Sequence, residues 1–214
     1  LCLTGGRVAN LAYEHLARVV RHSKVDPTQL ELWWTDEAFV PTDDPRRNSL
    51  QALSRLAGSF PLSPARTHPM PSSDASADPA QAALTYGTEL DGSIIDICLL
   101  GLGENGHVAA LHPGHPSADP TSAVAIGVTD SPKPPAEQVS LSLATINRSR
   151  EVWLFATGIH KAEAVPVRSV AIRRPSRRTS AASTERSGSS TTPRRRSCRS
   201  TPADSDRQGV GSTQ

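Results

Sequence analysis

Two kinds of apolar spacing alternate along most of the chain. Apolar residues recur every three or four positions in the segments Val8–Val20, Asn48–Leu56 and Asp78–Leu90, which predicts three helices. Short apolar runs predict strands at Leu1–Thr4, Leu30–Trp34, Arg66–Met70, Ile94–Leu100, Ala123–Val128, Val139–Leu143 and Val152–Ala156. Strands that alternate with helices predict an α/β fold of three layers, in which helices cover both faces of a mostly parallel, doubly wound (Rossmann-like) sheet.

Four polar or glycine-rich loops come directly after predicted strands. They are Gly5-Gly6, Asp36-Glu37, Gly101–His107 and Gly158–Lys161. Ligands of open parallel sheets bind outside the carboxyl ends of the strands. We therefore expect the four loops to meet at one edge of the sheet and to form a ligand site there.

Charge is unevenly distributed along the 214 residues, whose formal net charge is +2. Eleven of the 23 Lys and Arg residues, and three of the 21 Asp and Glu residues, lie in 168–214, which leaves 12 basic and 18 acidic residues in 1–167. The segment 168–214 is rich in Arg, Ser, Thr and Pro and poor in large apolar residues, so we expect it to be disordered. The chain thus divides into one folded domain, 1–167, and a basic tail, 168–214.

The basic tail has two interpretations. Arginine-rich runs neutralise phosphates, which is typical of nucleic-acid binding. We favour the other interpretation, a frameshift, because the helix that begins at Lys161 is not followed by a helix end and a further strand. On that interpretation the domain lacks its C-terminal end, and nucleic acid is not an expected partner. The chain also starts inside a strand-like Leu-Cys-Leu run without methionine, so we expect its N-terminal start to be missing.

The remaining bulk features indicate a soluble protein of the cytoplasm. Cys2, Cys98 and Cys198 do not have the spacing of metal ligands, and the first two lie in apolar runs, as buried reduced thiols do. No apolar stretch is long enough to span a bilayer, and no signal peptide is expected. We predict a cytoplasmic location, no contact with membranes, and no metal.

The segment "GLGENGHVAALHP", residues 101–113, permits two functions. Its G-x-G-x-x-G pattern after an apolar strand is typical of a dinucleotide-binding turn, whose third glycine lies in a helix and which needs an acidic residue about 20 positions on. Here "LHPGHP" ends any helix early, and Asp119 and Asp130 lie at unsuitable positions. The alternative is that the glycines free a turn that presents His107 as a catalytic imidazole, and we favour it.

Four segments resemble the 6-phosphogluconolactonase family. "GLGENGHVAALHP" is similar to the family's G-[LM]-G-x-[DE]-G-H-x-x-S-L-F-P, and "LELWWTDEAFVPTDDPRRN" to its W-[GT]-D-E-R-x-V-P-x-D-D-x-x-x-N. "LTGGRVANLAYEHL" resembles its glycine turn and first helix, and residues 128–165 resemble its stretch from D-S-P-K-P-P to K-A-x-A-V. The resemblance runs in order from Leu1 to about Val167. Leu111-His112-Pro113 favours this family over the related glucosamine-6-phosphate deaminases.

The resemblance implies an enzyme that hydrolyses 6-phospho-D-glucono-1,5-lactone to 6-phosphogluconate, in the oxidative pentose phosphate pathway, with no metal or cofactor. His107 is expected to act as general base and then acid, because one imidazole with a near-neutral pKa can do both. The neighbours that could orient it are Asn105 and Glu104. We expect a monomer or weak dimer whose partner is the small sugar-phosphate lactone.

The substrate-binding residues implied by the resemblance lie in the other loops. Gly5 and Gly6 open a helix, and helix N-termini bind anions such as phosphate. Lys161 matches the lysine of the family's G-x-x-K segment and adds a point charge. The other expected substrate-binding residues are Asp36 and Glu37, which would hold sugar hydroxyls, and Arg47, whose loop could reach the phosphate.

Departures from the family pattern leave two alternatives open. Ala38 stands in place of the arginine of the D-E-R segment, and Asn105 in place of the usual Asp or Glu. His112 replaces Phe, and Ala110 replaces Ser. The chain could therefore be an impaired or inactive protein that still binds sugar phosphates. The second alternative is an amino-sugar-phosphate isomerase or deaminase, which release of ammonia from glucosamine 6-phosphate would reveal.

Overall fold

The structure of this chain is a computed structural model that describes residues 1–157. Two predicted features, the Gly158–Lys161 loop with Lys161 and the tail 168–214, lie outside the described residues. So does the predicted helix that begins at Lys161.

A parallel sheet of four strands forms the centre of the fold. The strands are β1 (Cys2–Leu3), β2 (Trp33–Trp34), β4 (Ile97–Gly101) and β7 (Glu151–Phe155). Their order is β2-β1-β4-β7, and all three pairings are parallel. The chain moves outward from β1 to β2 and then returns to the other side of β1 with β4. The sheet therefore has a topological switch point between β1 and β4, where open α/β sheets bind their ligands.

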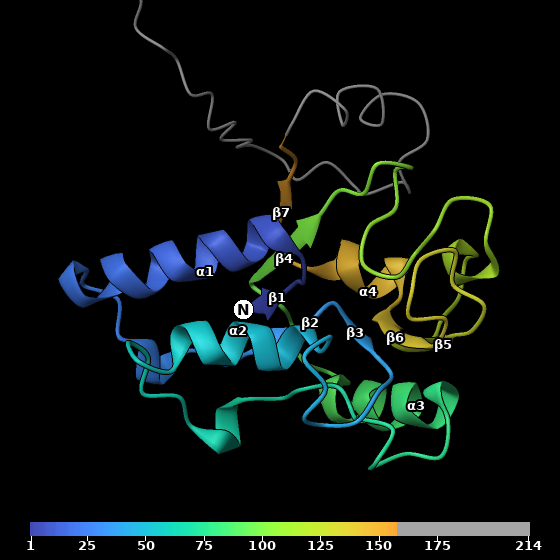
Figure 1. Cartoon of the computed structure of the whole chain (residues 1–214), viewed down its shortest axis with the longest axis horizontal. Coiled ribbons are helices and arrows are strands. Elements are labelled where there is room, and N and C mark those ends of the chain that lie inside the picture. Colours follow the sequence, from blue (N-terminus) through green and yellow to red (C-terminus); the bar gives the residue numbers. More distant parts are fainter. Residues whose placement is uncertain (158–214) are drawn as a thin grey trace, which may run out of the picture. The chain divides into compact units, whose positions relative to one another are not determined.

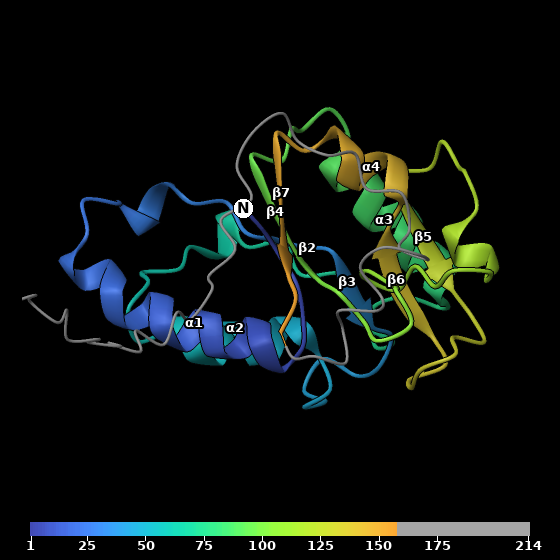
Figure 2. The same cartoon turned by 90° about the horizontal axis from the view of Figure 1, so that it is seen from above.

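Helices cover both faces of this sheet, as the sequence predicted (Figure 2). Helices α1 (Arg7–Val19) and α2 (Asn48–Leu56) lie together on one face, where they share a core with Leu3 and Leu99. Helices α3 (Pro79–Leu90) and α4 (Leu143–Arg148) lie on the other, where the core includes Cys98 and Leu100. Because successive residues of β4 point to opposite faces, its almost uninterrupted apolar run supplies both cores.

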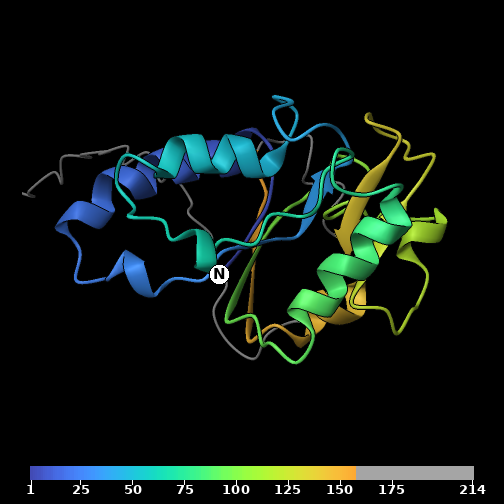
Figure 3. The ribbon, with the colours of Figure 1, turned by 90° about the horizontal axis from the view of Figure 1, so that it is seen from below.

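A second, antiparallel sheet was not predicted. It consists of β3 (Asp36–Ala38), β6 (Gln138–Leu141) and β5 (Ala125–Val128), in the order β3-β6-β5. Figure 3 shows α3 lying beside β5 and β6. The loop between β5 and β6 contains no helix, and parallel neighbours need a long crossover, so these strands pair antiparallel. The predicted α/β fold with a mostly parallel sheet is confirmed, and this second sheet is an addition to it.

Smaller differences separate the predicted and observed elements. The segment Arg66–Met70 makes only an isolated bridge, from Thr67 to Leu32, instead of a strand. Helix α4 and strand β3 were not predicted. The short 3-10 helices are η1 (Val20–His22), η2 (Pro27–Gln29), η3 (Pro64–Arg66) and η4 (Pro116–Ala118).

Two buried tyrosines hold the short strands β1 and β2 in place. The hydroxyl of Tyr13, on α1, accepts a hydrogen bond from the Thr4 amide at 2.9 Å and donates to the Thr4 carbonyl at 2.7 Å. The hydroxyl of Tyr86, on α3, accepts from the Trp34 amide at 2.8 Å and donates to its carbonyl at 3.1 Å. Burial raises the pKa of Tyr13 and of Tyr86, so both hydroxyls keep their protons. The helices thereby fix the carboxyl ends of two strands only two residues long, from which the loops of the predicted site depart (Figure 1).

Among residues 1–157, no helix is both long and apolar enough to cross a membrane.

Candidate active site

The loop after β4 is shaped by its glycines. The Gly103 amide donates to the His107 carbonyl at 2.8 Å, and the Gly106 amide donates to the Gly103 carbonyl at 3.1 Å. Gly106 has a φ of +81°, a conformation that glycine adopts readily. A side chain on Gly103 would collide with the imidazole of His107. The glycines therefore close a tight turn that seats His107.

No helix follows this turn, which decides between the two interpretations of the loop. Directly after His107 the chain makes another tight turn, in which the Leu111 amide donates to the Val108 carbonyl at 2.9 Å. The next element is the short 3-10 helix η4. A dinucleotide-binding turn requires an α-helix whose N-terminus meets the pyrophosphate. The dinucleotide interpretation is therefore wrong for this loop.

The ring of His107 is oriented by Asn105. The side-chain oxygen Oδ1 of Asn105 lies in hydrogen-bonding contact with Nδ1 of His107. An amide oxygen only accepts, so we assign the proton to Nδ1, and Nε2 then carries the lone pair that a general base needs. Glu104 is exposed beside them. Of the two neighbours expected from the sequence, Asn105 is in contact with Nδ1.

The acidic pair after β2 has two different environments. The fully buried carboxylate of Glu37 accepts hydrogen bonds from the Asn48 amide at 2.6 Å, the Ser49 amide at 2.9 Å and the Ala38 amide at 3.1 Å. It thus caps the N-terminus of α2. Burial raises the pKa of Glu37, against the opposing effect of Arg47 and these hydrogen bonds.

Asp36 is only half-buried, and its carboxylate accepts from Thr35 Oγ1 at 2.8 Å and from Asn48 Nδ2 at 3.2 Å. Burial raises the pKa of Asp36, which these hydrogen bonds oppose. Asp36 is therefore partly accessible at the site, whereas the buried Glu37 supports the start of α2.

Arg47 faces the interior. Its side chain is 3% exposed, and its guanidinium donates to the carbonyls of Met70 and Val40 and lies 3.6 Å from the Glu37 carboxylate. The neighbouring Arg46 is exposed and forms an ion pair with Asp44 at 2.6 Å, beside which the pKa of Asp44 falls to about 2. The structure therefore places Arg47 as the counter-ion of Glu37.

Asn48 lies among the predicted loops, although the sequence motifs did not single it out. Its side-chain nitrogen Nδ2 donates to the Asp36 carbonyl at 3.0 Å. Its side-chain oxygen Oδ1 occupies the space that a side chain on Gly5 would need. A Cβ on Gly101 would in turn meet the Gly5 carbonyl at 3.9 Å. The structure thus brings together three of the four predicted loops. The position of Asn48, at the start of a predicted helix and at the end of the quoted W-T-D-E motif, was the available signal.

The N-terminus of α1 lies at the same edge. Its cap residue is Gly6, with a φ of +97°, and no side chain caps the helix in the described part of the chain. The first turn contains no acidic residue. Unpaired amides at the positive end of a helix dipole form a ready binding site for an anion.

The chain has close relatives among known proteins. Residues 1–186 match the family model described as glucosamine-6-phosphate isomerases/6-phosphogluconolactonase. The 6-phosphogluconolactonase of Streptomyces coelicolor is 43% identical over 175 residues, which cover 76% of this chain and 67% of that protein. The chain belongs to this family. The Mycobacterium leprae 6-phosphogluconolactonase is 38% identical, with 77% of this chain and 70% of that protein covered. The solved structure of the Trypanosoma brucei 6-phosphogluconolactonase aligns with a TM-score of 0.64 at 27% identity, covering 76% and 72% of the two chains.

Two departures from the lactonase pattern acquire a structural meaning. Ala38, where the pattern has arginine, is buried in β3 and pairs with Gln138 of β6. Asn105, where the pattern has an acid, keeps the hydrogen bond to His107 but brings no charge. The chain therefore has a hydrogen-bond partner for His107 at position 105 and lacks two charges of the pattern.

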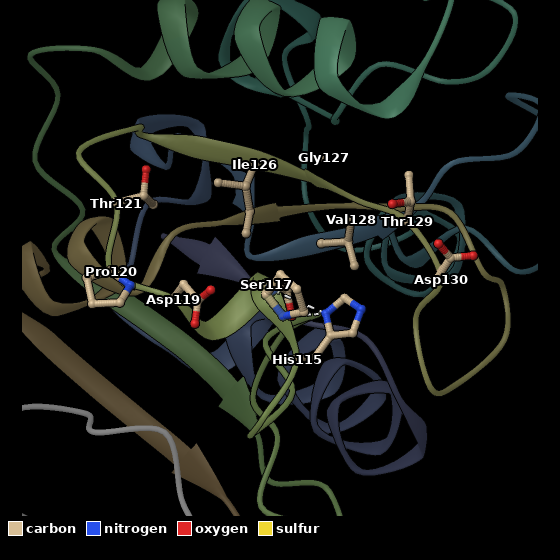
Figure 4. A pocket seen from close by; sticks show the side chains of 11 residues that line it. His115, Ser117, Asp119, Pro120, Thr121, Ile126, Gly127, Val128, Thr129 and Asp130 are labelled. Atoms are coloured by element: carbon tan, nitrogen blue, oxygen red, sulfur yellow. Dashed lines mark hydrogen bonds between the residues drawn. The ribbon is translucent and has the colours of Figure 1, made fainter.

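A hollow of about 370 Å³ is lined by η4, β5 and residues that adjoin them, including His115, Ser117, Asp119, Val128 and Asp130 (Figure 4). It contains none of the predicted site residues.

Proposed function

We propose that this chain hydrolyses 6-phospho-D-glucono-1,5-lactone to 6-phosphogluconate, with His107 as the general base and then the general acid. The observation that carries the proposal is the seating of His107 on a glycine turn beside the switch point of the sheet, with Nδ1 against Asn105. The relatives' name and the family pattern support the choice of substrate.

The reaction needs one group that takes a proton and later returns it. Nε2 of His107 accepts a proton from water as the water oxygen bonds to the lactone carbonyl carbon. The tetrahedral intermediate then expels the ring oxygen, and the bond between that oxygen and the carbonyl carbon breaks. The His107 imidazolium gives its proton to the leaving oxygen, which yields the free carboxyl group and the new hydroxyl. Positioned proton transfer of this kind contributes about 10²–10⁴-fold to the rate.

The phosphate of the substrate is assigned to the glycine turn and the N-terminus of α1. Gly5 and Gly6 allow an anion to approach the backbone without obstruction, and the helix dipole favours its charge. Lys161 is assigned to the same phosphate by the family pattern alone. Asp36 is assigned to sugar hydroxyls, because its carboxylate is at the sheet edge, while Glu37 and Arg47 hold Asn48 and the start of α2 in place.

Asn105 sets an electrostatic limit on the rate. When His107 holds the proton, a carboxylate at position 105 would stabilise the imidazolium by charge, whereas an amide contributes only a hydrogen bond. Charge-assisted hydrogen bonds are about twice as strong as neutral ones. We therefore assign this chain a lower turnover than a variant with aspartate at position 105.

The test is hydrolysis of the lactone by the purified chain, measured against the spontaneous rate. We expect His107→Gln to lower kcat by about 10²–10⁴-fold while 6-phosphogluconate still binds. Asn105→Asp is expected to raise kcat and to move the acidic limb of the pH-rate profile to higher pH. Binding without hydrolysis in every variant would mean a sugar-phosphate-binding protein, and ammonia release from glucosamine 6-phosphate would mean the deaminase activity. Either outcome would overturn the proposal.

A further inference from the structure

His112 lies directly against the proposed base. The ring centroids of His107 and His112 are 4.5 Å apart, and their planes differ by 28°. The cause is the tight turn between them, in which Val108 and Leu111 form an antiparallel bridge and Ala109 has a φ of +48°. Residues 107 and 112 flank this bridge and therefore lie side by side. His112 is buried, with 2% of its surface exposed.

The surroundings of His112 favour its uncharged form. Its Nδ1 is buried without a hydrogen-bond partner in the described part of the chain, and its Nε2 lies 3.4 Å from Ser131 Oγ. The titratable or charged groups around it are His107 and His115 on its own loop and Lys133 on the loop between β5 and β6. Burial, followed by the charges of His115 and Lys133, lowers the pKa of His112. Burial, His115 and Lys133 thus all disfavour a positive charge on His112 beside His107.

We propose that His112 is a positioning residue for His107: its buried ring holds the base in place by stacking, and the two rings carry at most one positive charge between them. This proposal rests on the proposed function for its effect on the rate, but not for the coupling between the rings. Two unit positive charges at this separation repel one another even in water, and more strongly at a partly buried site. Groups that interact in this way titrate as a pair.

Stacking and charge have separate consequences. A stacked ring limits the rotation of His107, so it affects the turnover of bound substrate more than its binding. The uncharged state of His112 matters when His107 becomes an imidazolium, because the neighbouring ring then presents its π face and not a like charge. The aromatic Phe of the family pattern at this position would provide the same face without a titratable nitrogen.

The first experiment is a series at position 112. We expect His112→Ala to lower kcat about tenfold through loss of orientation, with little change in the dissociation constant of 6-phosphogluconate. His112→Phe, which restores a ring, should recover most of the loss. Equal kcat in His112→Ala and the unaltered chain, or equal loss in both variants when both are folded, would overturn the positioning role.

The second experiment does not depend on activity. NMR titration of the imidazoles should show a higher pKa for His112 in His107→Gln than in the unaltered chain, because the competing charge has gone. The exposed His15 and His22 on the first helical segment serve as internal controls that should not change. An unchanged pKa for His112 would overturn the electrostatic coupling between the two rings. A chain that lacks lactonase activity but shows the coupling would contradict the proposed function alone.

Discussion

Gly103→Ala tests most sharply whether the glycines of the loop serve His107. A Cβ on Gly103 would come within 2.5 Å of Nε2 of His107 and closer still to Cε1 and Nδ1. An ordinary contact is 3.4 Å or longer, so the ring has to retreat by at least 0.9 Å. Misplacement of a catalytic group by about 1 Å costs on the order of 10²-fold in rate. We therefore expect kcat for lactone hydrolysis to fall on the order of 10²-fold.

The same substitution should have little effect on folding. Gly103 does not have the positive φ of Gly106, so alanine is compatible with its backbone. The displaced ring of His107 is only half-buried, and an off-rotamer side chain costs about 0.5–1.5 kcal/mol. The free energy of unfolding, measured by urea denaturation, should fall by no more than this amount. Loss of rate without loss of stability distinguishes a displaced base from a damaged fold.

Two further variants complete the test. Gly101→Ala is the matched control, because its Cβ would meet only the Gly5 carbonyl, at 3.9 Å. In the double variant Gly103→Ala/His107→Ala the ring is absent, so the alanine at position 103 should cause no additional loss of rate relative to His107→Ala. The reasoning would be refuted if Gly103→Ala kept the full kcat, or if the alanine were as harmful without the His107 ring as with it.

Three predictions concern stability. Tyr13→Phe removes the hydroxyl that accepts a hydrogen bond from the buried Thr4 amide, so the free energy of unfolding should fall by about 1–3 kcal/mol. A change near zero in urea denaturation would contradict this. Glu37→Gln leaves the buried Arg47 without its counter-ion, so the free energy of unfolding should fall by about 3 kcal/mol. An unchanged midpoint of urea denaturation would show that the ion pair does not stabilise the fold. Because the pKa of His112 is lowered from its usual 6.5 in the folded state, the unfolded chain binds a proton between the two pKa values that the folded chain does not. The unaltered chain should thus lose stability as the pH falls below 6.5, and His112→Phe should lose less; parallel pH profiles would be the contrary result.

The periodicity of apolar residues was sufficient to predict the central part of the fold. The apolar run before Gly101 predicted a strand buried on both faces, and the helical spacing of Asn48–Leu56 predicted α2 to the residue. The second sheet could not be predicted in the same way. Apolar spacing identifies a strand but not its partner, and the pairing of β6 with both β3 and β5 depends on the path of a loop that contains no helix.

Part of the candidate site could likewise be predicted from the sequence, and part could not. The meeting of three loops at one edge followed from the order of strands and helices. The burial of Glu37 and Arg47 did not, because adjacent charged residues in a loop sequence are more often solvated. The stacking of His112 on His107 could not be read from the sequence either, since it depends on the left-handed conformation of Ala109, a residue with no sequence preference for it.

The most direct test of the proposed activity is the rate of 6-phosphoglucono-1,5-lactone hydrolysis by the unaltered chain and by His107→Gln, each compared with the spontaneous rate. We predict hydrolysis above the spontaneous rate in the first and its loss in the second, with 6-phosphogluconate bound by both. Hydrolysis of equal rate in the two proteins would contradict the role of His107.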